Sequence, residues 1–508
     1  MAGIHNELRA IERQGLSRRV FLRNMLLTAG SISAAQWLTA CGGGSSGTSS
    51  SGVAPSGSGA PRTSPFASMG PLLPPDANGI QLPAGFTSRV VAVFNEPPLP
   101  SQPDFRWHSD PDGGAVFATE DGGWIYVSNS EARDATTAFG QIPAELSAIR
   151  RLASRDSLMA LSPITNAISG LVNTLLPGGI PLLLPFAGGA SALRFDQSGN
   201  LIDAYPVQRN TSTNCSGAAT PWGTWINGEE ILDGYMFECS PLRDGGEPIR
   251  LDRFGRKAHE QVAFDVERRA IYHTEDITGE DRFYRNVYTE NEWPSNGRPD
   301  LTRGKLQVLS VPAGIDAARQ GPTPIVWLDA IDDGRPQADV YLPESTIFAG
   351  NEGVWFVNGF IYFSTKVDSN VWAIDVANGT IESIYDPTDG PIGSPADPAE
   401  PKMMGVDNLS MTLDGEMIVV EDGGDMRAMV LLPDRSTIPL LRLPGDAGGT
   451  EVTGPAFSPD GRRLYVSNQR ALRNGETVSF GQGGVVYEIT MPFTVRVNPP
   501  VARAMPAA

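Results

Sequence analysis

One pattern recurs six times along the chain and limits what the chain can fold into. Each unit has a polar or acidic residue, a short apolar strand, a turn that is at or near glycine in five of the six units, a second apolar strand, and another polar or acidic residue. The six units span residues 114–131, 215–230, 260–276, 352–366, 408–422 and 454–469. Since a unit of this length is one β-hairpin, its two polar ends return to the same edge.

Reuse of one hairpin at long, irregular spacing is typical of a β-propeller, in which each hairpin forms the inner strands of a blade. We therefore predict an all-β fold, a six-bladed β-propeller with a partly helical insertion. Outer strands are expected within residues 193–205, 304–311, 370–385 and 429–443. Residues 483–490 are expected to complete a blade begun near the N-terminal end. The even reuse of one hairpin disfavours the alternatives, a β-sandwich with insertions or two separate domains.

The predicted insertion has apolar residues at helical spacing over residues 143–155 and 163–176. Pro177, Pro181 and Pro185 follow and rule out a continuous membrane helix. We expect the segment to pack against the propeller, and a flap over one face is the alternative.

The N-terminal residues have the features of an export signal. Residues 17–23 read SRRVFLR, a twin-arginine motif, and residues 38–41 read LTAC, which resembles the lipobox of bacterial lipoproteins. We expect a signal segment (1–41), a Gly/Ser/Pro-rich linker (42–80), the propeller (81–495) and a C-terminal tail (496–508). The protein would then be a periplasmic or cell-surface lipoprotein, exported by the twin-arginine route and anchored in the membrane through Cys41.

The formal net charge of −19 disfavours nucleic acid as a partner. Acidic residues are instead concentrated at the ends of the hairpins, which a propeller would bring to one mouth of its channel. Two carboxylates about 4 Å apart repel by roughly 4 kcal/mol at an effective dielectric near 20, so several together call for cations. The candidate metal ligands are Cys215, Glu229, Glu230, Glu260, Glu275, Glu352, Asp407, Glu421 and Asp422.

The cysteines allow two interpretations. With Cys41 set aside, Cys215 and Cys239 are the remaining pair, so a disulfide competes with metal ligation by Cys215. A thiolate favours iron or zinc, whereas carboxylates favour calcium or magnesium.

Several blocks resemble a known family. NCSGAATPWGTWINGEE from Asn214, KAHEQVAFD from Lys257, NEGVWF from Asn351 and VDNLSMTLDGEMIVVEDG from Val406 are similar to successive blocks of the PhoX-type alkaline phosphatases. The resemblance runs from about Gln81 to Thr490. It implies twin-arginine export, a six-bladed propeller, and a cluster of calcium and iron in which Cys215 bridges the irons. The implied carboxylate ligands are Glu229 or Glu230, Glu260, Glu275, Glu352 and Glu421.

The resemblance also implies hydrolysis of phosphate esters, with a small phosphorylated molecule as substrate and a monomeric enzyme. The candidate catalytic residues are Glu352, Asn408 and His259, and a structural role for His259 stays open. Gly350 stands where the family more often has a phosphate-holding arginine, so we expect weak or altered activity. The alternatives are a calcium-dependent propeller lactonase or esterase and a noncatalytic, metal-stabilised binding propeller.

Overall fold

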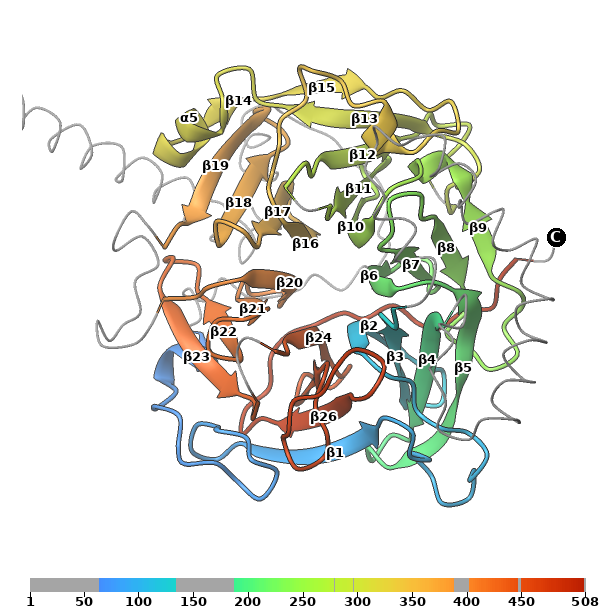
Figure 1. Ribbon diagram of the computed structural model, residues 1–508, viewed down its shortest axis with the longest axis vertical. Coiled ribbons are helices and arrows are strands. Elements are labelled where there is room, and N and C mark those ends of the chain that lie inside the picture. Colours follow the sequence, from blue (N-terminus) through green and yellow to red (C-terminus); the bar gives the residue numbers. More distant parts are fainter. Residues whose placement is uncertain are drawn as a thin grey trace, which may run out of the picture.

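The computed structural model describes residues 64–133, 187–277, 279–295, 297–387, 402–445 and 449–506. The expected export signal and the expected helical insertion lie outside these ranges. The fold prediction is confirmed, because six antiparallel sheets are arranged as blades around a central axis (Figure 1).

Each blade runs from an inner strand at the axis to an outer strand at the rim (Figure 1). Blade 1 contains β2 (Pro111–Ala118), β3 (Trp124–Ser130), β4 (Gly188–Phe195) and β5 (Leu201–Thr211). Blade 2 contains β6 (Asn214–Ala219), β7 (Trp225–Glu229), β8 (Met236–Cys239) and β9 (Ile249–Leu251). Blade 3 contains β10 (His259–Asp265), β11 (Ala270–Glu275), β12 (Phe283–Val287), β13 (Lys305–Ser310) and β15 (Val326–Asp329).

Blade 4 contains β16 (Asn351–Val357), β17 (Phe360–Thr365), β18 (Asn370–Asp375), β19 (Thr380–Tyr385) and β14 (Thr323–Pro324). Blade 5 contains β20 (Val406–Met411), β21 (Met417–Glu421), β22 (Arg427–Leu431) and β23 (Thr437–Arg442). Blade 6 contains β24 (Val452–Phe457), β25 (Arg463–Asn468), β26 (Val485–Thr490) and β1 (Thr87–Val93). The six predicted hairpins are therefore the inner strand pairs of the six blades.

Blade 6 closes the ring, as predicted from residues 483–490. Its outermost strand β1 comes from the N-terminal side and pairs antiparallel with β26, from Thr87 opposite Thr490 to Val93 opposite Val485. The two distant ends of the propeller are thus joined by backbone hydrogen bonds within one sheet.

Aromatic side chains fill the spaces between neighbouring blades. Tyr126 of blade 1 stacks on Tyr465 of blade 6 with ring centroids 4.8 Å apart, and Phe283 of blade 3 lies 4.6 Å from Phe363 of blade 4. All four side chains are fully buried. Burial of each such side chain stabilises the fold by about 1.5–3 kcal/mol, so these contacts hold the blades in a fixed radial arrangement.

The segments flanking the strands also belong to this structure. Phe66, in the region expected to be a linker, is buried against Phe493, with ring centroids 5.2 Å apart. Residues 496–506 run beneath the hairpin turns, where the amide of Leu413 donates to the carbonyl of Arg496 (2.8 Å) and that of Ala118 to Pro500 (2.9 Å).

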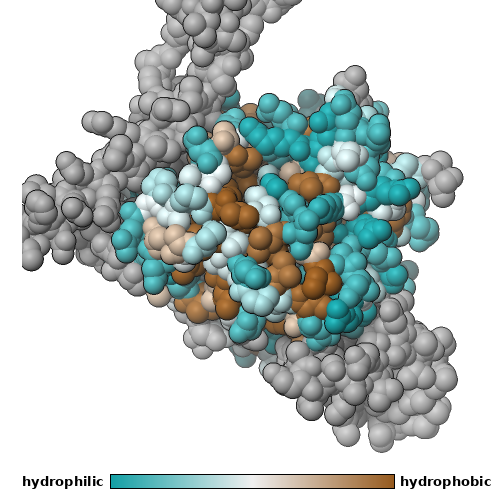
Figure 2. All heavy atoms as spheres, turned by 90° about the horizontal axis from the view of Figure 1, so that it is seen from above, coloured by the Kyte–Doolittle hydropathy of each residue, from teal (hydrophilic) through white to brown (hydrophobic). Residues whose placement is uncertain are grey.

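The outer rim is mixed in character. Figure 2 shows it from the side of β14 and β15, where apolar residues gather between hydrophilic ones. Val326 and Ile331 are among the large apolar side chains exposed in this part of the chain. Within the described ranges, no helix is long and apolar enough to cross a membrane.

Candidate metal centre and active site

The register of the six inner hairpins brings equivalent residues to one mouth of the channel. Near the start of each inner strand, one residue pairs with the last residue of the second strand, and a bulge follows. These pairs are Pro111 with Ser130, Asn214 with Glu229, His259 with Glu275, Asn351 with Thr365, Val406 with Glu421, and Val452 with Asn468. Because successive side chains of a strand face opposite sides, the next residue of each strand has the other orientation.

These next residues make up the acidic mouth. On the inner strands they are Asp112, Cys215, Glu260, Glu352, Asp407 and Thr453, and after the second strands they are Glu131, Glu230, Asp276, Lys366, Asp422 and Gln469. Blade 6 contributes neutral residues at both positions. It instead supplies Glu451, which directly precedes β24.

Three groups of these side chains have potential ligand atoms within 4.8 Å of one another. They are Asp112, Glu131 and Cys215; Cys215, Glu230 and Glu260; and Asp407, Asp422 and Glu451. Each group draws on two blades, and Cys215 belongs to two groups. The sulfur atom of Cys215 would therefore be able to hold an ion in either group.

Buried amides hold some of these carboxylates in place. Gln469 Nε2 donates to Asp112 Oδ2 (2.5 Å) and to Glu131 Oε2 (2.6 Å). Asn408 Nδ2 donates to Asp407 Oδ1 (2.7 Å), while its Oδ1 accepts from the amide of Gly454 (3.0 Å). Asn408 thus ties blade 5 to blade 6 beside the mouth.

Burial sets the electrostatics of the mouth. Burial, followed by the charge of Glu131, raises the pKa of Asp112 to about 8. Burial and then the charge of Asp112 raise the pKa of the Cys215 thiol well above its ordinary value. Burial also raises the pKa of Glu260, and Glu352 adds to the effect. Without cations, the mouth therefore favours protonated, neutral side chains.

Glu260 shows that the site fits a cation. Both of its carboxylate oxygens are buried and have no hydrogen-bond partner among the described residues. A buried carboxylate without a partner is costly, and a cation bound beside Cys215 and Glu230 would remove that cost. Carboxylate oxygens suit calcium, and a thiolate suits iron or zinc, so this donor set fits a mixed site.

The structure brings together six of the nine ligand candidates, namely Cys215, Glu230, Glu260, Glu352, Asp407 and Asp422. The other three side chains are engaged elsewhere. Glu229 accepts from the amides of Ser212 (2.9 Å) and Tyr235 (3.2 Å). Glu421 makes two bonds to the Arg427 guanidinium, at 2.8 and 3.0 Å.

Glu275 accepts from Tyr341 Oη at 3.0 Å. His259 lies beside it at the start of β10, fully buried, with Nε2 3.1 Å from the Gly255 carbonyl and its ring 6.3 Å from that of His273. Burial lowers the pKa of His259 well below its ordinary value. The neutral ring of His259 thus belongs to the interior of blade 3.

Sequence reasoning missed Asp112, Glu131, Asp276 and Glu451 as candidates. Asp112 and Glu451 precede the predicted hairpin limits at 114 and 454. The six hairpins are equivalent, and this equivalence was the signal that could have found them. An acidic residue at the rim position of one hairpin predicts functional residues at the same position of the other hairpins.

Both cysteines of the propeller are free, buried thiols. Cys239 Sγ lies 3.6 Å from the Trp225 carbonyl oxygen, within the interior of blade 2. The Cys215–Cys239 disulfide that the sequence left open is therefore not formed in this structure.

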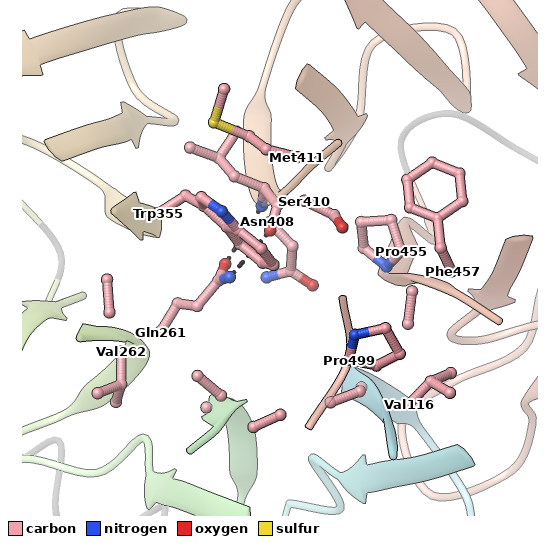
Figure 3. A pocket seen from close by; sticks show the side chains of 18 of the residues that line it. Val116, Gln261, Val262, Trp355, Asn408, Ser410, Met411, Pro455, Phe457 and Pro499 are labelled. Carbon is pink, nitrogen blue, oxygen red and sulfur yellow. Dashed lines mark hydrogen bonds between the residues drawn. The ribbon is translucent and has the colours of Figure 1, made fainter. Parts of the chain in front are cut away.

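Below the acidic mouth, the channel contains a cavity of about 430 Å³. Apolar side chains such as Val262, Trp355 and Met411 line it (Figure 3). Gln261 bridges blade 3 to blade 5, since its Nε2 donates to the Leu409 carbonyl (2.9 Å). Pro499 of the C-terminal segment lines the same cavity.

Gly350, the position of the expected arginine, has a backbone that suits glycine. Its φ is +66°, and a Cβ atom there would lie 2.9 Å from the Val367 amide nitrogen and 3.0 Å from Lys366 Cβ. A larger residue would be strained by its own conformation and crowded by its neighbours.

The fold and the mouth together define a class, a six-bladed β-propeller with a thiol and many carboxylates at one end of its channel. The family model described as alkaline phosphatase PhoX matches residues 185–341. The family resemblance is thereby confirmed over the stretch that contains the sequence blocks beginning at Asn214 and Lys257.

Solved structures that are similar to this protein include one of a PhoX protein. Pseudomonas fluorescens PhoX, in complex with vanadate, a transition state analogue, has a TM-score of 0.58 at 15% identity over 83% of this chain and 97% of that chain. A gluconolactonase of Xanthomonas campestris has a TM-score of 0.39 at 11% identity over 84% of this chain and 98% of that chain. No curated protein sequence matches the chain.

Proposed function

We propose that this protein is an exported phosphatase that hydrolyses phosphate esters with calcium and iron ions held at the acidic mouth. The observation that carries the proposal is Glu260, a buried carboxylate without a hydrogen-bond partner beside a thiol and further carboxylates. Such a constellation is unstable as a set of bare anions and suits a group of cations.

The residues present fit distinct roles toward those ions. Cys215, shared between two groups, would hold iron, and the oxygen-only group of Asp407, Asp422 and Glu451 would hold calcium. Bound ions of this kind neutralise phosphoryl oxygens and make a water molecule more acidic. Asn408 and Gln469 orient their carboxylate partners, which keeps the ligands in a preorganised arrangement.

The substrate would be a small phosphorylated molecule. Vanadate, bound by the Pseudomonas fluorescens relative, is described as a transition state analogue, and binding of such an analogue is the property expected of a site that stabilises phosphoryl transfer. A similar fold alone does not specify the ester, so the proposal extends to the class of phosphate esters.

We further propose that twin-arginine export delivers the folded protein and that Cys41 becomes its lipidated N-terminus. The support is the order of the SRRVFLR motif, the apolar run and the LTAC lipobox. Intact-mass analysis of membrane-extracted protein should show an acylated N-terminus at Cys41. A mature protein cleaved elsewhere would refute this part.

The decisive experiment combines metal analysis with hydrolysis of an aryl phosphate by the purified protein. Cys215→Ser should lose most of its iron and its activity, whereas Cys239→Ser, a matched change of a buried thiol away from the mouth, should keep both. Equal metal loss in the two variants would contradict the proposal. Calcium alone, together with lactone hydrolysis and no phosphatase activity, would favour the lactonase alternative.

A further inference from the structure

Lys366 is the one cationic residue among the six rim positions that follow the second strands. The equivalent residues in the other five hairpins are Glu131, Glu230, Asp276, Asp422 and Gln469. An ammonium group therefore stands where blades 1, 2, 3 and 5 place a carboxylate. It is a cation that the chain itself supplies to the acidic mouth.

The ammonium of Lys366 reaches carboxylates from three blades. Its Nζ atom lies 2.5 Å from Glu352 Oε1, 3.2 Å from Asp276 Oδ2 and 3.2 Å from Asp422 Oδ2. The exposed fractions of these three side chains are 2%, 13% and 28%. Three partly or fully buried carboxylates thus converge on one positive charge, in the way that protein carboxylates converge on a metal ion.

Neighbouring residues fix the position of Lys366. Its amide donates to the carbonyl of Gly350 at 2.6 Å, and the preceding Thr365 accepts from Trp372 Nε1 at 2.9 Å. A Cβ atom on Gly350 would meet Lys366 Cβ at 3.0 Å. The glycine and the lysine are therefore complementary, because the absence of a side chain at residue 350 leaves the room that the lysine occupies.

We propose that Lys366 is a tethered cation that takes the place of one metal ion at the mouth, by neutralising Glu352, Asp276 and Asp422. The inference rests on the proposed function, since it concerns how many ions the same mouth takes. The ions would then be held by the two groups around Cys215 and by the group of Asp407, Asp422 and Glu451, in which the two carboxylate oxygens of Asp422 can serve the ammonium and the ion together.

The test is the calcium stoichiometry of the metal-free full-length protein, measured by calorimetric titration with calcium chloride, together with its melting temperature in chelator. Lys366→Met removes the charge at nearly constant volume. It should melt at a lower temperature than wild type without metal and should bind one more calcium ion per chain. Lys366→Arg should resemble wild type in both measurements.

Lys305→Met is the matched control, because Lys305 pairs with Asp329 on the exposed outer strands, where both side chains are more than half exposed. It should change neither measurement. If Lys366→Met does not fold without metal, Lys366→Gln, whose amide still donates to a carboxylate, should show the same gain of one calcium ion.

The outcomes separate this inference from the proposed function. A wild-type protein that binds no metal would refute the metal-dependent function, while a calcium site gained by Lys366→Met would still support the tethered cation. A wild-type protein with calcium and iron, and a Lys366→Met variant with the same calcium count and the same metal-free melting temperature, would overturn the inference and leave the function standing.

Discussion

At the scale of single residues, two adjacent glutamates at the end of β7 have different environments. Glu229 is fully buried and accepts from backbone amides, which fixes the loop around it. Glu230, one residue later, lies within 4.8 Å of Cys215 and Glu260. Alternation along the strand separates a structural carboxylate from a candidate metal ligand.

This contrast predicts opposite effects of two neighbouring substitutions. Glu230→Gln should lower the metal content while the melting temperature in chelator stays the same or rises, because burial favours a neutral group at this position and the amide is neutral without taking up a proton. Glu229→Gln should keep the metal and lose about 1–3 kcal/mol of stability, since buried bonds to a charged group are weakened. Metal analysis and denaturant unfolding of both variants check this, and a larger metal loss in Glu229→Gln would contradict it.

Gly350 allows a second prediction at this scale. Gly350→Arg should not strengthen phosphate binding, and it should lower the free energy of unfolding by about 2 kcal/mol or more, because of the left-handed backbone and the contact with Lys366. Gly359→Arg is the control, because Gly359 has a φ of +81° but open space around it. A rise in kcat/KM of Gly350→Arg on an aryl phosphate at unchanged stability would show the prediction to be wrong.

At the scale of elements, hairpins were predictable because their signals are local. Two apolar runs around a turn, which contains glycine in five of the six hairpins, identified every inner strand pair, and residues 483–490 indicated the closure of the ring. The register was not predictable to one residue, because the bulge after His259 decides whether Glu275 or Asp276 faces the mouth. That bulge depends on pairing across the blade, which no local pattern encodes.

The role of the C-terminal segment in the fold could not be predicted from its composition. Residues 496–508 resemble a tail in sequence, yet Arg496 and Pro500 accept hydrogen bonds from two hairpin turns, and Pro499 lines the channel cavity. The contacts join residues 83 positions apart for Leu413 and Arg496, and 382 positions apart for Ala118 and Pro500, so only the folded ring reveals them.

Truncation after Val495 should therefore destabilise the propeller. It removes several backbone hydrogen bonds, each contributing about 0.5–1.5 kcal/mol, and uncovers an apolar cavity. The expected results are a lower melting temperature and increased binding of an apolar fluorescent dye. Truncation after Pro506 is the control and should change neither; a stable protein truncated after Val495 that excludes the dye would count against this role.

At the scale of the whole molecule, the buried acids predict how stability depends on pH. The folded protein raises the pKa of Asp112 and that of Glu275 to about 8, in both cases mainly by burial. It also raises the pKa values of Glu260, Asp407 and Glu451, again mainly by burial. The metal-free folded state thus binds more protons than the unfolded chain between about pH 4 and pH 8.

The stability supplied by these protons is fully present below the ordinary pKa values and is lost as the pH rises through the raised ones. In chelator, the melting temperature should fall by several degrees from pH 5 to pH 8, since each unit of pKa shift corresponds to about 1.4 kcal/mol. Added calcium and iron should restore stability at pH 8 by mass action. A metal-free protein that becomes more stable toward pH 8 would contradict this account.

Each ligand group is divided between two blades, and this division links metal binding to the assembly of the propeller. Asp407 and Glu451 lie on either side of the boundary between blades 5 and 6, and blade 6 is complete only when β1 meets β26. A chain in which blade 6 has not assembled would lack the complete group of Asp407, Asp422 and Glu451. Metal binding by this group would then occur only after blade 6 has joined blade 5. A bound ion at this position would therefore indicate that the ring has assembled.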